Sequence, residues 1–449
     1  MVPDRPARRL TGLTRVFDRP ARRGHAVGVT RRPGGLPWPA AALLALVVGG
    51  CGPAPSPSGL AIGASPPSGT AAAPSVVPAT PVPNPGHELY GFIPYWEMDD
   101  TIAADLVHTP LTTVALFSVT STAKGAIDAS KPGTKAIEGA VGAAIIDTAH
   151  AAGARVDLVF SSFGAGRNKT FFGHTAVQDA TIAALVALVG TLGIDCLDVD
   201  VEGLDSQLIP AYGAFVGRLR ASLVAAHPAG QVTVATGPGP TGAAMAVAAL
   251  AAGADRAFLM GYDYRTATSD PGGTSPLARA DGGRTLPWSL DAYAAAGVPV
   301  TKLLLGLPLY GVRWPVTAPV VGAPRTGNGV VWVIRKHADL LGNSAIVPTV
   351  DDLEGVAVYF EGSDGSTGVP SFDPAASLDP SATPSTVTWT AAYVDTPATL
   401  ARKLGLAESR GLAGAGFWAI GYERGLPAYT DLMRTFTSGS VPPQVLPGG

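Results

Sequence analysis

Eight short apolar segments recur through residues 89–421, and stretches with helical spacing of Ala and Leu separate most of them. The segments are apolar almost throughout, which is typical of strands buried on both faces of a parallel sheet. Eight such strands alternating with helices predict an α/β fold, a (β/α)8 TIM barrel with its active site at the C-terminal strand ends. The segments are residues 89–96, 112–119, 155–163, 194–202, 231–237, 256–264, 302–310 and 413–421.

The regular spacing breaks once, between the seventh and eighth segments. The chain there is longer than a single connecting helix requires, and it includes the runs VVWVIRKHADLLG, GVAVYFEG and STVTWTAAYVD. We expect a small α+β insertion at about 315–395, between strand 7 and strand 8. The alternative is a long irregular loop, which is rarer in compact domains.

The charge of the chain is divided unevenly along its length. The formal net charge is −3, yet residues 1–50 hold nine Arg against Asp4 and Asp18, about +7, which leaves about −10 on the remainder. An acidic body repels phosphate backbones, so we expect no nucleic-acid partner.

The N-terminal part predicts export. An apolar run at 40–48 is too short to span a bilayer and follows an Arg-rich stretch, as in a signal peptide. Small residues directly before Cys51 indicate a lipoprotein leader over 1–51, with Cys51 lipidated and anchored to the membrane. A plain secretory signal or an uncleaved anchor are the alternatives, and Arg31 with Arg32 leaves the Sec and twin-arginine routes both open.

A Pro/Ser/Ala-rich linker follows at 52–86, with almost no charge, and its composition predicts an extended tether. The only other cysteine, Cys196, lies between strand residues and is interpreted as a small buried apolar side chain.

The run GIDCLDVDVEG at 193–203 places carboxylates at every second position: Asp198, Asp200 and Glu202. Alternate strand residues share a face, so these three side chains face the interior of the predicted barrel. Asp195 has the opposite parity and is interpreted as structural. Stacked carboxylates cannot all ionise, so one or more pKa values rise, and Glu202 at the strand end becomes a plausible proton donor.

Three other interpretations of this run remain open. An edge strand with a solvated face would also carry carboxylates. A calcium loop is suggested by D-x-D-x-E-G, although Ile209 stands where the bidentate Glu belongs. A purely structural cluster is disfavoured, because three facing charges cost more than packing returns.

The run DCLDVDVE at 195–202 resembles the D-x-x-D-x-D-x-E signature of glycoside hydrolase family 18, the chitinase-like family. MGYDY at 260–264, GLPLYG at 306–311 and GFWAIGYE at 416–423 resemble further strand motifs of that family. GFIPYW at 91–96 resembles its spore-cortex and peptidoglycan-lytic branch. The resemblance implies a catalytic barrel over 87–437 with a C-terminal tail at 438–449. The segment SSFGAG, 161–166, departs from the family's usual S-x-G-G.

The resemblance also implies a mechanism and a set of site residues. Glu202 would protonate the glycosidic oxygen while the N-acetyl carbonyl of the substrate attacks the anomeric carbon. Asp200 would orient the acetamide, Asp198 would share a proton with Asp200, and Tyr262 would bind the acetamide oxygen. The implied substrate-binding residues are Tyr95, Trp96, Met260, Asp263, Tyr310 and Trp418.

We therefore expect an exported, cell-surface glycoside hydrolase of the chitinase or N-acetylglucosaminidase type. It would act on β-1,4-linked N-acetylglucosamine glycans in chitin, chitooligosaccharides or the peptidoglycan of the cell wall, by retaining catalysis. We expect no cofactor, no metal and a monomer. A non-catalytic chitin- or peptidoglycan-binding barrel at the cell surface is the alternative.

Overall fold

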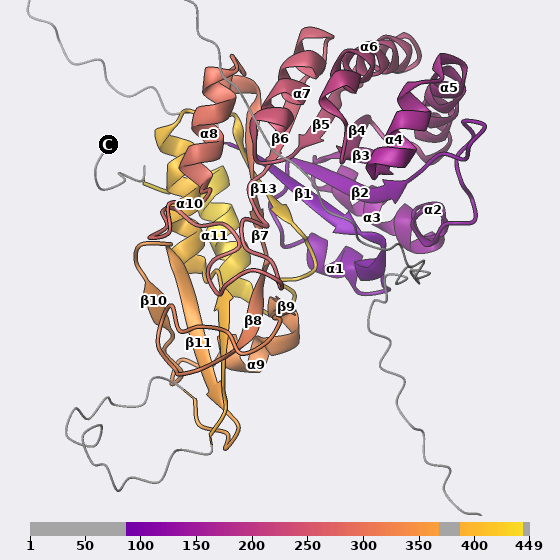
Figure 1. The fold of residues 1–449 in the computed structure, drawn as a ribbon. Helices are drawn as coiled ribbons and strands as arrows, with labels where there is room; N and C mark the ends of the chain where they lie inside the picture. The colour runs from indigo at the N-terminus through magenta and orange to yellow at the C-terminus, as the bar shows by residue number, and fades with distance from the viewer. Residues whose placement is uncertain (1–86, 368–386, 443–449) are drawn as a thin grey trace, which may run out of the picture. The chain divides into compact units, whose positions relative to one another are not determined.

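The computed structural model describes residues 87–367 and 387–442, and its centre is a closed barrel of eight parallel strands (Figure 1). Around the barrel the strands follow the order β1-β13-β7-β6-β5-β4-β3-β2. The predicted (β/α)8 TIM barrel is thereby confirmed. Its strands are β1 (Glu88–Pro94), β2 (Thr113–Val119), β3 (Arg155–Phe163), β4 (Cys196–Glu202), β5 (Val232–Thr236), β6 (Arg256–Met260), β7 (Leu303–Pro308) and β13 (Gly414–Trp418).

Helices cover the outside of the barrel, and the main apolar core lies between them and the strands. Within residues 87–367 and 387–442, one helix, α5, is long and apolar enough to cross a membrane, but its buried Leu185 and Val189 belong to this core. The helices are α1 (Ile102–Leu106), α2 (Pro132–Ile137), α3 (Ala140–Ala151), α4 (Ala165–Phe172), α5 (Thr175–Leu192), α6 (Ile209–Ala226), α7 (Pro240–Ala251), α8 (Leu286–Ala295), α10 (Pro397–Ser409) and α11 (Pro427–Thr437), with the 3₁₀ turns η1 (Tyr95–Glu97), η2 (Ser206–Leu208) and η3 (Val300–Lys302).

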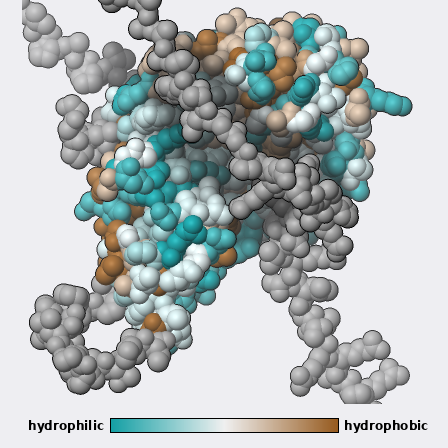
Figure 2. All heavy atoms as spheres, in the orientation of Figure 1, coloured by the Kyte–Doolittle hydropathy of each residue, from teal (hydrophilic) through white to brown (hydrophobic). Residues whose placement is uncertain are grey.

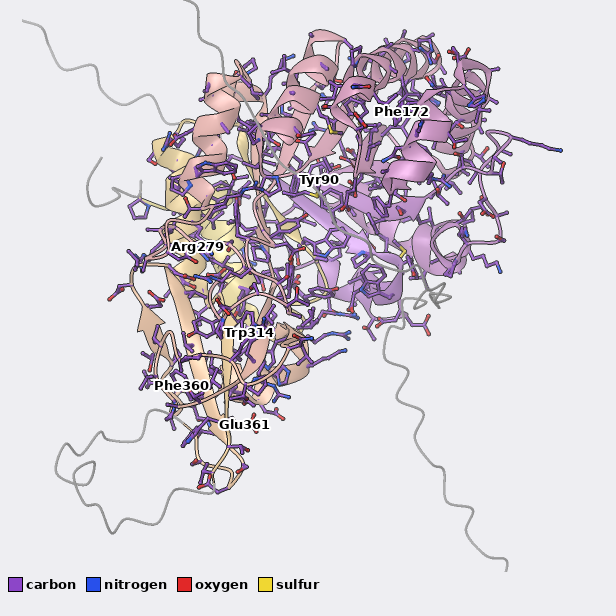
Figure 3. All side chains as sticks on the ribbon, viewed as in Figure 1. Tyr90, Phe172, Arg279, Trp314, Phe360 and Glu361 are labelled. Carbon is purple, nitrogen blue, oxygen red and sulfur yellow. The ribbon has the colours of Figure 1, made fainter. Side chains whose placement is uncertain are left out.

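The barrel interior has a second, smaller cluster of buried side chains. Tyr90, Phe92, Val159 and Phe258 belong to it, and they come from strands on different sides of the barrel. Figure 3 shows Tyr90 within the barrel. The cluster fills the interior, so polar side chains on strand β4 must pack against it or rise above it.

The chain between β7 and β13 forms a five-stranded antiparallel sheet, in the order β10-β11-β12-β8-β9. Trp314 and Phe360 lie in its own apolar core (Figure 3). The expected α+β insertion between strands 7 and 8 is therefore confirmed, and the irregular-loop alternative is wrong. Its elements are β8 (Tyr310–Val316), β9 (Val330–Val333), η4 (Ile334–His337), α9 (Ala338–Leu341), β10 (Thr349–Asp351), β11 (Val356–Gly362) and β12 (Trp389–Val394).

The surface in the view of Figure 2 mixes hydrophilic and hydrophobic residues, with the hydrophobic ones scattered among the others. The leader at 1–51, the linker at 52–86 and Cys51 lie outside the described residues.

Candidate active site

Strand β4 carries the three carboxylates as a column that rises through the barrel, and we call Asp198, Asp200 and Glu202 the acid column. Asp198 is 0% exposed and Asp200 3%, whereas Glu202, the last residue of β4, is exposed. Both flanking strands pair with β4 in parallel, so β4 is not an edge strand and that alternative is wrong. The column therefore begins in a dry interior and ends at the rim.

Burial dominates the electrostatics of the two lower carboxyls. Burial raises the pKa of Asp198 well above its usual range, and Asp200 and Asp157 raise it further. Burial also raises the pKa of Asp200, with Glu202 as the second cause. One oxygen of each, Oδ1, is buried without a hydrogen-bond partner among the described residues. Both carboxyls thus hold a proton more readily than an exposed aspartate does.

A third buried carboxyl in the barrel interior, Asp157 of β3, was not predicted from the sequence. The hydroxyl of Tyr90 donates to Asp157 Oδ2 at 2.8 Å and lies 3.4 Å from Asp198 Oδ2. Burial raises the pKa of Asp157 to about 7, although the Tyr90 hydrogen bond opposes the shift. Asp157 and Ser161 lie on the same face of β3. The two-residue alternation along this strand could therefore have predicted that Asp157 faces the barrel interior.

The segment after β3 holds the backbone of Glu202 in place. The carbonyl oxygen of Glu202 accepts hydrogen bonds from the backbone N–H of Gly164 at 2.9 Å and from Nδ2 of Asn168 at 2.7 Å. Asn168 is fully buried and accepts in turn from Ser162 Oγ at 2.7 Å. The SSFGAG segment thus anchors the end of the acid column. Sequence reasoning did not find Asn168.

The end of β6 supplies the opposite wall. Tyr262 is buried, and burial followed by the charge of Asp200 raises the pKa of its hydroxyl, which keeps it a hydrogen-bond donor. Asp263 adopts a left-handed φ of 60°, uncommon for a residue other than glycine. Its Oδ1 accepts a hydrogen bond from the Tyr310 hydroxyl at 2.5 Å. This bond ties the end of β6 to the first residue of the insertion.

A cavity of about 370 Å³ opens beside Glu202. Met260, Tyr262 and Asp263 line it together with Glu202, so the structure brings these four sequence-predicted residues together. Apolar side chains from the neighbouring loops and α7, including Leu204, Pro238 and Met245, complete the wall. A volume of this size fits a small organic ligand or one part of a chain-like one.

The other predicted aromatic residues lie at the ends of β1 and β13: Tyr95 and Trp96 follow β1, and Trp418 ends β13. Trp418 ends β13 and packs edge-on against Phe117, with ring centroids 4.7 Å apart. Trp96 is 41% exposed and lies 6.2 Å from Trp418, and Tyr95 packs edge-on against Trp96 at 4.9 Å. Phe163, at the end of β3, adds a second exposed ring that the sequence analysis did not single out.

Asp195 acts as a strand anchor, as its parity predicted. Its Oδ2 accepts from the backbone N–H of Val156 at 2.8 Å and lies 2.9 Å from His150 Nε2. Over the described residues, no group of three His, Cys, Asp or Glu side chains is arranged to hold a metal ion. The strand geometry of 196–202 also contradicts the calcium-loop alternative.

Sequence comparison decides the family. The profile of "Glycosyl hydrolases family 18" matches residues 91–423, which run from within β1 past β13 and include the insertion. The chain belongs to glycoside hydrolase family 18. Family membership and the chitinase names of its relatives support a glycoside hydrolase.

Curated relatives of this family 18 chain match it over part of their length. A class V chitinase from Lotus japonicus is 29% identical over 176 residues, 38% of this chain and 38% of the relative. Chitinase C from Streptomyces lividans is 30% identical over 170 residues, 36% of this chain and 23% of the relative. The matches thus span less than half the length of these relatives.

Solved structures of family 18 share the fold at low sequence identity. A group IV chitinase from Ostrinia furnacalis in complex with allosamidin has a TM-score of 0.64 at 16% identity, covering 79% of this chain and 99% of that one. The spore cortex-lytic enzyme of Bacillus cereus has a TM-score of 0.57 at 16% identity, covering 78% and 74%. A chitinase-like agglutinin from Robinia pseudoacacia has 0.62 at 16%, covering 77% and 99%.

Proposed function

We propose that the protein is an exported glycoside hydrolase that cleaves β-1,4-linked N-acetylglucosamine glycans by substrate-assisted, retaining catalysis. The observation that carries the proposal is the acid column, which ends in Glu202 at the mouth of a cavity walled by Tyr262. A barrel that only bound glycan would not need a proton donor at this place.

Glu202 is the proton donor of the proposed reaction. It is the exposed member of the column, lines the cavity, and has its backbone fixed by Gly164 and Asn168. The glycosidic oxygen of a bound glycan can therefore approach its carboxyl. Protonation makes the departing sugar a better leaving group.

The acetamide of the substrate takes the place of a protein nucleophile. Its carbonyl oxygen attacks the anomeric carbon, the bond to the leaving sugar breaks, and a positively charged oxazolinium ring forms. Asp200 lies one step below Glu202 on the same strand face and offers a carboxyl to the acetamide N–H. The Tyr262 hydroxyl, held protonated, donates to the acetamide oxygen.

Asp198 supports Asp200 by sharing a proton with it, because two neighbouring buried carboxyls cannot both be ionised. The charge of Asp200 raises the pKa of Asp198, and the charge of Asp198 contributes to the raised pKa of Tyr262. A proton held between Asp198 and Asp200 can move toward Asp198 when the oxazolinium forms, which leaves negative charge beside the positive ring.

The relatives and the cavity support the proposed substrate class. A Cycas revoluta chitinase of this fold was solved with (GlcNAc)3, and a Nicotiana tobaccum class V chitinase with NAG4. Glu202, Asp263 and Tyr262 line the cavity and offer hydrogen-bonding groups to the hydroxyl and acetamide groups of an N-acetylated sugar. Assays on chitooligosaccharides and on muropeptide-bearing glycan distinguish chitin from peptidoglycan.

The site of action is proposed to be the cell surface, with the protein held by a lipid on Cys51. The support is the sequence alone: an apolar run at 40–48, small residues before Cys51, and an uncharged Pro/Ser/Ala-rich linker at 52–86.

The first test replaces the proton donor. Glu202→Gln should keep the fold and glycan binding but lower turnover about 10²–10⁴-fold, because the amide cannot donate a proton as an acid does. Turnover is measured on chitooligosaccharides, and Glu361→Gln, an exposed glutamate of the insertion, is the matched control. Binding without turnover in the unmodified protein would favour the non-catalytic alternative, and wild-type turnover in the variant would place the donor elsewhere.

The second test addresses substrate assistance. Attack by the acetamide and then by water inverts the anomeric centre twice, so the product first formed should be the β-anomer by proton NMR. A thiazoline analogue of the oxazolinium should bind much more tightly than the parent sugar, and Asp200→Asn should weaken that binding. An α-anomer as first product, or efficient cleavage with glucose at the reacting position, would overturn the mechanism.

A further inference from the structure

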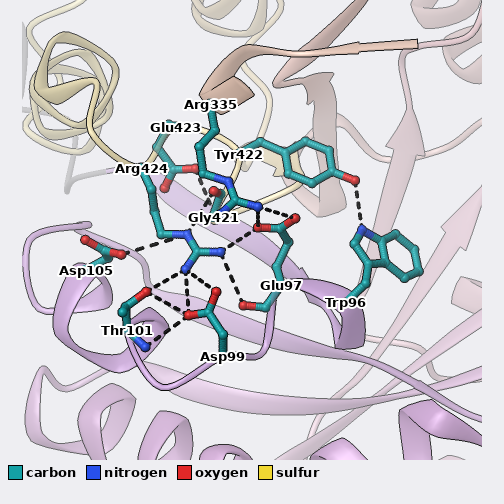
Figure 4. Close-up of polar contacts among 10 residues, drawn as sticks. All are labelled: Trp96, Glu97, Asp99, Thr101, Asp105, Arg335, Gly421, Tyr422, Glu423 and Arg424. Atoms are coloured by element: carbon teal, nitrogen blue, oxygen red, sulfur yellow. Dashed lines mark hydrogen bonds and ion pairs between the residues drawn. The ribbon is translucent and has the colours of Figure 1, made fainter. Parts of the chain in front are cut away.

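A buried carboxylate outside the acid column, Glu97, joins three distant segments of the chain (Figure 4). Glu97 is 4% exposed and ends η1, directly after β1. Nη2 of Arg424, from the segment after β13, lies 2.6 Å from its Oε2. Nη2 of Arg335, from η4 of the insertion, lies 3.0 Å from its Oε1 and 2.8 Å from its Oε2. We call Glu97, Arg335 and Arg424 the Glu97 cluster.

The two arginines of the cluster are held differently. Arg424 also binds Asp99 at 2.8 Å and the Gly421 carbonyl at 3.1 Å, so the barrel holds it without the insertion. Arg335 binds Glu97 through Nη2, and its buried Nε has no hydrogen-bond partner among the described residues. Removing Arg335 would therefore leave Glu97 still paired with Arg424, so the fold should survive while the insertion's hold on Glu97 is lost.

The residue before Glu97 is the exposed indole of Trp96. Its Nε1 donates to the hydroxyl of Tyr422 at 3.0 Å, and Tyr422 lies two residues before Arg424. The indole lies 6.2 Å from the rings of Trp418 and Phe117, so it belongs to the aromatic group at the ends of β13, β1 and β2. The indole is thus held in two places, by the backbone of η1 and by the Tyr422 hydroxyl. Both belong to segments that the Glu97 cluster connects.

We propose that Arg335 is a positioning residue: by binding Glu97 it fixes the indole of Trp96 as a stacking surface for a sugar beyond the one that reacts. The inference rests on the proposed function and deepens it, because it makes the insertion part of the glycan-binding apparatus. An indole held in one orientation packs against the apolar face of a pyranose without first losing rotational freedom, so binding costs less entropy. Nη2 of Arg335 contacts both carboxylate oxygens of Glu97, and a lysine in its place would keep the positive charge but not the planar guanidinium that sets the reach and direction of this contact.

The first arm of the test measures binding of an N-acetylglucosamine hexamer by calorimetry in the full chain carrying Glu202→Gln, so that hydrolysis does not interfere. Arg335→Ala should raise Kd roughly three- to tenfold, and Arg335→Lys should raise it less. With Trp96→Ala also present, Arg335→Ala should raise Kd no further. Arg313→Ala, which removes an exposed ion pair with Glu361 on the same insertion, should leave Kd unchanged.

The second arm needs no ligand. The acrylamide quenching that belongs to Trp96, taken as the difference between chains with Trp96 and with Trp96→Phe, should increase on Arg335→Ala. Equal Kd changes with and without Trp96, or unchanged quenching of Trp96, would overturn the inference. Failure of the proposed function would give a different result. The Glu202→Gln chain would then not bind the hexamer at all, while Arg335→Ala would still increase the quenching of Trp96. If Arg335→Ala does not fold, Arg335→Lys carries both arms with the same criteria.

Discussion

At the scale of single residues, the interior of the barrel holds three buried carboxyl groups, those of Asp157, Asp198 and Asp200. Asp157 and Asp198 both lie within reach of the Tyr90 hydroxyl, which has one proton to donate and favours Asp157 by distance. Asp198 and Asp200 each keep one buried oxygen without a hydrogen-bond partner among the described residues. The group as a whole is therefore stable only when it carries protons, and its protonation links stability to pH.

The residue-scale prediction concerns Asp157. Burial raises its pKa to about 7, so between pH 4 and 7 the folded state keeps a proton that the unfolded state releases. Stability from this group is fully present below about pH 4 and is lost as pH rises to 7, by at most on the order of 4 kcal/mol. Asp157→Asn removes the titration, so its free energy of unfolding in urea should decline less steeply over this range. Asp147→Asn, on an exposed face of α3, is the control, and identical slopes for wild type and Asp157→Asn would contradict the assignment.

At the scale of elements, a buried ion pair ties the end of the insertion to the barrel. Lys403 of α10 is fully buried, and its Nζ lies 2.5 and 2.6 Å from the two carboxylate oxygens of Asp395, which directly follows β12. Ser275, from the segment between β6 and α8, donates to Asp395 at 3.0 Å and accepts from Lys403 at 2.9 Å. The pair thus joins three elements at the point where the chain returns from the insertion to the barrel.

The element-scale prediction removes one partner of this pair. Lys403→Met leaves Asp395 buried without its counter-charge, so the free energy of unfolding should fall by about 3–5 kcal/mol. The exposed pair of Arg410 with Asp291 serves as the control, since Arg410→Ala should cost less than about 1 kcal/mol. KM for chitooligosaccharides should stay unchanged in both variants, because neither residue lines the cavity. Equal losses of stability in the two variants would show that the buried pair has no special role.

At the scale of the whole molecule, the barrel presents the acid column, the cavity and the exposed aromatics at one end. The exposed aromatics lie at the C-terminal ends of β1 and β3, as does Glu202 on β4. The insertion reaches this end through Tyr310 and Arg335, which bind Asp263 and Glu97. A surface enzyme working on a polymer would need this end clear of the membrane. The proposed linker would provide the distance between the two.

The whole-molecule prediction tests the anchor. If residues 52–86 form the proposed extended linker, these 35 residues would span up to about 110 Å. Cys51→Ser should move the protein from the membrane fraction to the medium, as measured by fractionation and immunoblotting, with Ser56→Ala in the linker as control. Chitooligosaccharide turnover per molecule should not change, because the barrel is untouched. Unchanged fractionation of Cys51→Ser would remove the lipid anchor from the proposal.

The sequence by itself determined the barrel, the place of the insertion and the inward face of β4. These features depend on local patterns: the length and spacing of apolar runs, and the two-residue alternation that sends Asp198, Asp200 and Glu202 to one face. Met260, Tyr262 and Asp263 were predicted through the resemblance of MGYDY to the family motif, and the structure places them at the end of β6, beside Glu202. The family resemblance added roles to these residues.

Only the tertiary structure decided which side chains complete the site. Tyr90 meets Asp198 across 108 residues of sequence, Asn168 reaches the Glu202 carbonyl across 34, and Arg335 meets Glu97 across 238. No periodicity links such positions, because their contact depends on how barrel closure and the docking of the insertion bring separate strands together. Asp157, Asn168 and Arg335 look like ordinary polar residues in the sequence, and their surroundings in the folded chain give them their roles.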